Sequence, residues 1–120
     1  ATRAPALRWA EQYCYTEADG FKGFDYNTDK DGIWFEGTAQ MALAYSAAGE
    51  KDKADMFLKE LIRAQTSARN HNGKGMVAAS RDHVSTGLGT YYFNRLHVGA
   101  TAWCIFAERG INPFTGKACR

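Results

Sequence analysis

A carboxylate and an amide stand one helical turn apart in the most apolar stretch of the chain. Glu36 and Gln40 lie within residues 32–45 (GIWFEGTAQMALAY), and residues four apart share one face of a helix. The stretch is otherwise apolar nearly all round, as is typical of a buried helix. Beside Trp34, the pair predicts a sugar-binding cleft with Glu36 as the proton donor. The alternative is that Glu36 only stabilises the helix dipole.

Glycoside hydrolysis needs a second carboxylate across the scissile bond. Two aspartates are candidates, Asp82 in a long polar loop and Asp31 just before the buried helix. We take Asp82 as the catalytic partner of Glu36.

Further polar and aromatic side chains complete the predicted binding site. Arg95 and His97 stand at the start of the last predicted helix, where free backbone N–H groups favour hydroxylated or anionic ligands. Sugar rings stack on aromatic side chains. The predicted substrate-binding residues are Trp34, Gln40, Tyr91, Arg95 and His97, with Tyr92 and Trp103 as further aromatic candidates. Alternatively, His97 is a core histidine, Arg95 forms a surface salt bridge, and Trp103 packs in the core.

Residues 25–36 (DYNTDKDGIWFE) carry alternating oxygen side chains that invite comparison with a calcium loop. An EF-hand loop has glycine at its sixth position and glutamate at its twelfth. Counting from Asp25 puts Lys30 sixth, whereas counting from Asn27 puts Gly32 in register but Thr38 twelfth. The pattern therefore favours a turn whose Asx side chains bond their own backbone, and we expect neither a metal nor another cofactor.

Four helices must position these side chains. The patterns predict them over residues 5–16, 34–48, 52–68 and 95–109. Apolar residues of the third helix recur at helical spacing, and charged residues fill its other face. The second and third helices, separated by Gly49, form a helical hairpin. Residues 18–33 and 70–90 are predicted loops, the second with a short extended segment at residues 76–79. The prediction is an all-α fold in one domain, residues 1–120.

Composition excludes several classes of function. The 120 residues carry 15 basic and 13 acidic side chains without a basic cluster, which argues against nucleic acid as a partner. No stretch reaches the ~18 apolar residues of a membrane span, so no membrane partner is expected. The chain has neither a serine nucleophile elbow nor a phosphate-binding loop. The three cysteines form no Cys-x-x-Cys pair, and a bridge between Cys104 and Cys119 is left open.

Residues 34–40 (WFEGTAQ) and 97–103 (HVGATAW), with residues 112–114 (NPF) downstream, resemble the six-hairpin glycosidase-like proteins. The resemblance covers residues 20–115 and implies a partial (α/α)6 toroid with inner helices lining a cleft. A complete toroid needs roughly 350 residues, so the resemblance implies the C-terminal portion of one, a fragment of a larger α/α barrel.

The resemblance implies carbohydrate binding or processing, as in a glycoside hydrolase if the chain is active, with an oligosaccharide as partner. An isolated portion exposes inner-helix surface, and large apolar patches mark interaction sites. We therefore also expect a homo-oligomer or docking to another chain. The alternative function is a non-enzymatic helical module that binds a protein partner.

Overall fold

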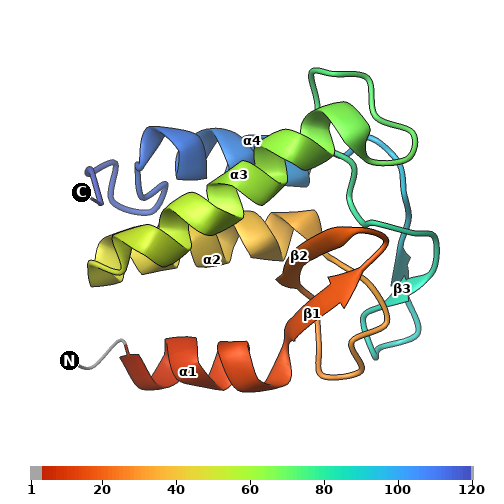
Figure 1. Ribbon diagram of the computed structural model, residues 1–120, viewed down its shortest axis with the longest axis horizontal. Helices are drawn as coiled ribbons and strands as arrows, with labels where there is room; N and C mark the ends of the chain where they lie inside the picture. Colours follow the sequence, from red (N-terminus) through yellow and green to blue (C-terminus); the bar gives the residue numbers. More distant parts are fainter. Residues whose placement is uncertain (1–3, 120) are drawn as a thin grey trace.

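The fold, seen in a computed structural model that describes residues 4–119, combines four helices with two small antiparallel sheets (Figure 1). The predicted all-α partial toroid is therefore wrong, and the chain is mixed α/β. The elements in chain order are α1 (Ala4–Tyr13), β1 (Tyr15–Ala18), β2 (Phe21–Phe24), α2 (Phe35–Ala48), α3 (Lys51–Ser67), β3 (Val84–Ser85), β4 (Tyr91–Tyr92) and α4 (Val98–Arg109).

The first hairpin lies where the sequence predicts the end of a helix and a loop. Strands β1 and β2 pair antiparallel, with Tyr15 opposite Phe24. Asp19 and Gly20 join them with φ angles of 55° and 82°. An Asp-Gly pair with two positive φ angles forms the tight turn that matches the twist of a hairpin. The helix predicted over residues 5–16 therefore ends at Tyr13.

Helix α2 is the centre of the domain and packs against α1, α3 and α4. As predicted, it forms a hairpin with α3, and Gly49 between them adopts a φ of 79° as the left-handed cap. The buried face of α3 consists of Ala54, Phe57, Leu61 and Ala64. Phe57 stacks on Tyr45 of α2 at a centroid distance of 5.7 Å and an interplanar angle of 9°. This aromatic contact joins α2 and α3 in the core.

An extended, almost fully buried segment, residues 76–80, joins the start of α2 to the start of α4. On one side, the N–H of Phe35 donates to the carbonyl of Ala78 at 3.0 Å. On the other side, the N–H of His97 donates to the carbonyl of Met76 at 2.8 Å. The N-terminal ends of α2 and α4 therefore lie side by side.

Helix α4 begins three residues later than predicted because the chain before it pairs with this buried segment. Val77 and Leu96 form an antiparallel bridge, so residues 95–97 are held extended. His97 is the N-cap, and its Nδ1 accepts a hydrogen bond from the N–H of Ala100 at 3.1 Å. No helix of the described part of the chain is long and apolar enough to cross a membrane.

Helix α1 is attached to the core through Glu11. Its Oε1 accepts a hydrogen bond from the hydroxyl of Tyr45 at 2.7 Å, and its carboxylate pairs with Lys53 and Arg8. Burial works to raise the pKa of Glu11, but hydrogen bonds from Lys53, Tyr45 and Arg8 outweigh it and lower the pKa to about 2. The ionised carboxylate therefore stabilises the fold.

We expect Glu11→Gln to lower the free energy of unfolding at neutral pH by about 1–2 kcal/mol, discounted because 26% of the side chain is exposed. A lowered folded-state pKa stabilises above the unfolded value of 4.5, and that stability is lost as the pH falls toward 2. Urea denaturation at several pH values measures the difference in the free energy of unfolding between variant and wild type. If the difference seen at neutral pH were unchanged at about pH 2.5, the ionised carboxylate of Glu11 would not be its source. Glu17→Gln on β1 is the control.

Candidate functional site

Three of the predicted site residues meet where α2 and α4 begin. Oε2 of Glu36, in the first turn of α2, lies 3.8 Å from Nδ1 of His97. The amide of Gln40 donates to Oε1 of Glu36 at 3.5 Å. A carboxylate, an amide and an imidazole thus gather at two adjacent helix N-termini, where backbone N–H groups favour negative charge.

The capping role of His97 determines which of its nitrogens offers a proton. Nδ1 accepts a hydrogen bond from the N–H of Ala100, which requires Nδ1 to be unprotonated. In the neutral imidazole the proton is then on Nε2. His97 is 38% exposed at its side chain, so this N–H is available to a ligand.

Tyr92 joins the polar residues to an aromatic cluster. Its ring lies 5.6 Å from Trp34, 5.7 Å from Tyr26 and 5.9 Å from His97 between centroids. Burial raises the pKa of Tyr92, and the negative charge of Glu36 raises it further. The hydroxyl therefore keeps its proton and can donate. We call Trp34, Glu36, Gln40, Tyr92 and His97 the Glu36 site.

Two glycines make room for these side chains. A Cβ atom at Gly37 would lie 2.2 Å from Cε3 of Trp34, and one at Gly99 would lie 2.6 Å from Oε2 of Glu36. The absence of a side chain at position 37 lets the indole ring lie against the first turn of α2. The absence of a side chain at position 99 likewise lets the carboxylate of Glu36 lie against α4.

The other predicted site residues make contacts outside the Glu36 site. Oδ1 of the exposed Asp82 accepts a hydrogen bond from the N–H of Asn94 at 3.0 Å. Tyr91 is 50% exposed and contacts His83. The exposed Arg95 lies over the ring of Phe93 at 5.2 Å. Within the described residues, no hydrogen bond or ion pair joins any of these three to Glu36.

The structure brings Tyr92 of β4 to the Glu36 site and directs its neighbour Tyr91, which was predicted to bind substrate, toward His83. Successive side chains of a strand point to opposite faces of the sheet. Tyr92 turns toward Trp34 while Tyr91 turns toward His83. The strand is two residues long, so its sequence carries no alternation that distinguishes the two faces.

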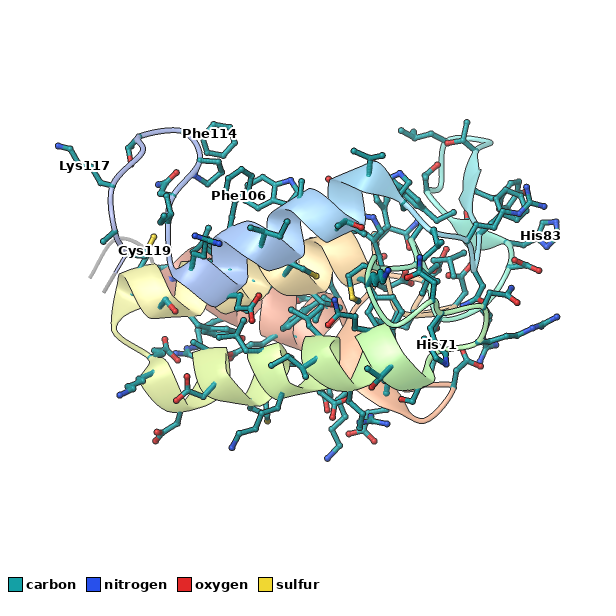
Figure 2. All side chains as sticks on the ribbon, turned by 90° about the horizontal axis from the view of Figure 1, so that it is seen from above. His71, His83, Phe106, Phe114, Lys117 and Cys119 are labelled. Atoms are coloured by element: carbon teal, nitrogen blue, oxygen red, sulfur yellow. The ribbon has the colours of Figure 1, made fainter. Side chains whose placement is uncertain are left out.

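A groove of about 700 Å³ adjoins the Glu36 site through Gln40. Trp103 of α4 and Phe114 of the C-terminal loop line it, with ring centroids 5.9 Å apart. Phe114 is 85% exposed, and Figure 2 shows it in the loop after α4, far from His83. The lining residues are Ala6, Leu7, Gln40, Leu43, Ala44, Ala47, Trp103, Asn112, Pro113, Phe114 and Cys119.

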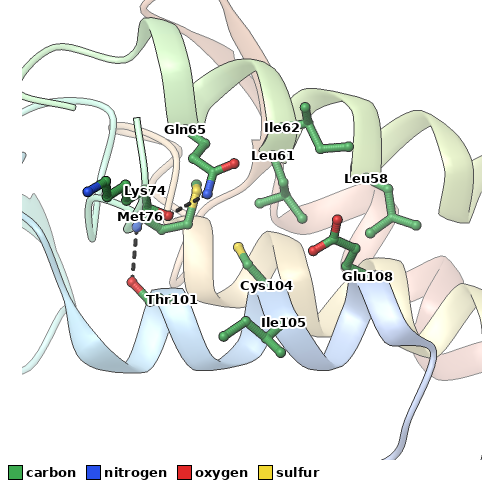
Figure 3. Close-up of a pocket in the computed structure, with 10 residues that line it drawn as sticks. All are labelled: Leu58, Leu61, Ile62, Gln65, Lys74, Met76, Thr101, Cys104, Ile105 and Glu108. Atoms are coloured by element: carbon green, nitrogen blue, oxygen red, sulfur yellow. Dashed lines mark hydrogen bonds between the residues drawn. The ribbon is translucent and has the colours of Figure 1, made fainter. Parts of the chain in front are cut away.

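A second, much smaller pocket of about 90 Å³ lies between α3 and α4 (Figure 3). Its wall includes Cys104, whose pKa burial raises to about 12, with a contribution from the charge of Glu108. The thiol is therefore protonated and is a poor nucleophile. Cys104 and Cys119 are free thiols, so the bridge left open by the sequence is not formed.

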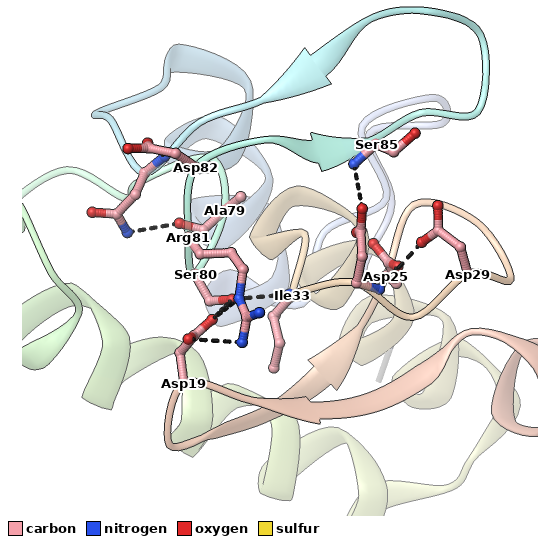
Figure 4. Close-up of polar contacts among 11 residues, drawn as sticks. Asp19, Asp25, Asp29, Ile33, Ala79, Ser80, Arg81, Asp82 and Ser85 are labelled. Atoms are coloured by element: carbon pink, nitrogen blue, oxygen red, sulfur yellow. Dashed lines mark hydrogen bonds and ion pairs between the residues drawn. The ribbon is translucent and has the colours of Figure 1, made fainter.

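The acidic loop before α2 is ordered by its own side chains, as the Asx-turn interpretation predicts. Oδ1 of Asn27 accepts from the N–H of Asp29, and Oδ1 of Asp29 accepts from that of Asp31. Asp25 is 3% exposed. Its burial and the neighbouring carboxylates of Asp29 and Asp31 raise its pKa to about 7. In Figure 4 the side chains of Asp25 and Asp29 lie together near Ser85.

Comparison of the chain with family models, curated proteins and solved structures finds no match. A relationship to six-hairpin glycosidase-like proteins therefore stays an expectation from residues 34–40, 97–103 and 112–114. The functional argument rests on the geometry of the Glu36 site and its groove.

We expect Gly37→Ala to displace the Trp34 ring and to lower the free energy of unfolding by about 1–3 kcal/mol through overpacking. Near-UV circular dichroism and urea denaturation report both effects. The matched control is Gly75→Ala, because a Cβ there meets its nearest atom, Oγ1 of Thr101, only at 3.4 Å. Equal stability and equal spectra for the two variants would show that the indole does not lie against position 37.

Proposed function

We propose that this chain binds carbohydrate at the Glu36 site and along the adjoining groove. The observation that carries the proposal is the convergence of Glu36, Gln40 and His97 beside the rings of Trp34 and Tyr92. Sugars present both hydroxyl groups and C–H faces, and such a site matches both. The carboxylate accepts hydroxyl protons, the amide and Nε2–H donate, and the aromatic rings pack against the C–H faces.

The groove suits a ligand longer than one sugar ring. It begins at Gln40, which belongs to the Glu36 site, and it extends to Trp103 and Phe114. Its volume of about 700 Å³ falls within the common range for ligand pockets. An oligosaccharide with one unit at Glu36 and the next units against Trp103 and Phe114 satisfies this arrangement.

The contacts of the site motivate a proposal of binding, not of hydrolysis. Hydrolysis requires two carboxyl groups at separations of about 5–10 Å around the scissile bond. Glu36 contacts an amide and an imidazole, both of which a bound sugar can replace or share, and the predicted second carboxylate, Asp82, is hydrogen-bonded to the backbone of Asn94. The proposal is therefore a binding function, with Glu36 as a ligand-binding carboxylate.

A second candidate function, protein interaction, is favoured by the surface of α4. Val98 is 86% exposed, and Leu96 and Ile105 are about half exposed. With Ala102 they line a shallow hollow of about 410 Å³. Sedimentation velocity over a range of concentrations tests this candidate as self-association: a weight-average mass that rises with concentration supports it, and a constant monomer mass removes it.

For the carbohydrate proposal, we expect one class of oligosaccharide to change the tryptophan fluorescence saturably during titration. Tyr92→Ala should weaken binding by more than about twofold and up to about tenfold, since an aromatic contact contributes about 0.5–1.5 kcal/mol. Tyr91→Ala is the matched control and should leave affinity within about twofold, because Tyr91 faces away from the site. Trp34→Phe identifies which of the three tryptophans reports the change.

Glu36→Gln keeps the size of the side chain and removes its charge. We expect it to weaken carbohydrate binding about tenfold, because hydrogen bonds to a charged group are stronger than neutral ones. Isothermal titration calorimetry with the sugar found in the fluorescence panel measures this. Unchanged affinity in both Glu36→Gln and Tyr92→Ala would place the ligand outside the Glu36 site.

A further inference from the structure

Three aspartates gather in the loop between β2 and α2. Asp25, Asp29 and Asp31 each place a carboxylate oxygen within 4.8 Å of the others. Lysine and arginine side chains make ion pairs elsewhere, yet none of those seen in the described part of the chain involves these three aspartates. Lys30, within the loop, instead donates to the carbonyl of Gln12 at 3.2 Å.

Asp25 is buried, and Asp31 is partly buried with one fully buried carboxylate oxygen. Asp25 is 3% exposed, and its two oxygens accept one backbone N–H each, from Tyr26 and Asp31. Oδ1 of Asp31 is fully buried and has no hydrogen-bond partner among the described residues. An unpaired buried carboxylate oxygen carries a cost in desolvation unless it is neutralised or bound. A bound ligand of positive charge would remove this cost.

We propose that the loop of Asp25, Asp29 and Asp31 binds a calcium ion. Three carboxylates supply hard oxygen ligands and enough negative charge for a divalent cation, and Ca²⁺ tolerates the irregular geometry of a loop. No cysteine or histidine belongs to this cluster of the described residues, which disfavours zinc and copper. Mg²⁺ is disfavoured because it demands near-ideal octahedral geometry and gives up its water reluctantly.

The ion would order the aromatic side of the Glu36 site. Tyr26, which follows Asp25, lies against Trp34 with ring centroids 4.8 Å apart. Oδ2 of Asp31 accepts a hydrogen bond from the N–H of Ser85 at 2.9 Å. Ser85 is in β3, which pairs with the strand that carries Tyr92. The aspartate loop is therefore connected to the β3–β4 hairpin and to the aromatic rings of Tyr26, Trp34 and Tyr92. The binding of a cation by this loop does not depend on the proposed carbohydrate binding.

The test is calorimetric titration of the chelator-treated full chain with CaCl₂, together with thermal unfolding with and without the ion. We expect one Ca²⁺ per chain with a Kd between about 1 µM and 1 mM. The midpoint of unfolding should rise because the ligand binds only the folded state. MgCl₂ should bind at least about tenfold more weakly.

Asp29→Asn is the informative variant because Asp29 is exposed, so the variant should fold, and asparagine keeps an acceptor for the N–H of Asp31. We expect it to weaken Ca²⁺ binding at least about tenfold and to abolish most of the thermal shift. Asp52→Asn, which removes an exposed charge from the first turn of α3, should bind Ca²⁺ like the wild type. Absence of saturable binding up to about 10 mM Ca²⁺, or equal affinities in the two variants, would overturn the proposal.

Discussion

The structure depends on the backbone hydrogen bonds of one buried extended segment, residues 76–80. It accepts from Phe35 at the start of α2 and from His97 at the start of α4. Buried backbone groups must be paired, so this segment fixes the separation and the orientation of two helix beginnings that are more than 60 residues apart in sequence. Glu36 and His97 meet because of that pairing. If the pairing register of this extended segment shifted by one residue, its side chains would exchange the two faces of the segment.

The side chains around this junction divide into two groups with different physical roles. Glu36 lies at the N-terminal ends of two helices, an environment that favours a carboxylate without a cationic partner. The aspartates of the loop have no such support for the buried oxygen of Asp31. The surroundings of Glu36 suit the exchange of hydrogen bonds with a neutral ligand. Those of the aspartate loop suit a ligand with a permanent positive charge. The two arrangements are linked through one ring contact, because Tyr26, which follows Asp25, lies against Trp34.

Local patterns predicted the parts of the fold that depend on local energetics. The α2–α3 hairpin follows from helical periodicity and from the cap at Gly49. The all-α prediction was wrong because the Asp19-Gly20 turn was read as loop, although an Asp-Gly pair between short aromatic strands is a hairpin signal. The start of α4 depends on pairing with a distant segment, which no local pattern contains. The convergence of Glu36, Gln40 and His97 is non-local for the same reason, whereas the four-residue spacing of Glu36 and Gln40 was visible in the sequence.

The central claim is that the paired helix beginnings form one ligand-binding surface. The most direct measurement is chemical-shift mapping of the ¹⁵N-labelled chain during titration with oligosaccharides. The account predicts that shifted amides gather at the first turns of α2 and α4, around Trp34, Tyr92 and His97, and along the groove to Phe114. Shifts confined to α3 and β1, or no shifts with any sugar of a broad panel, would contradict it.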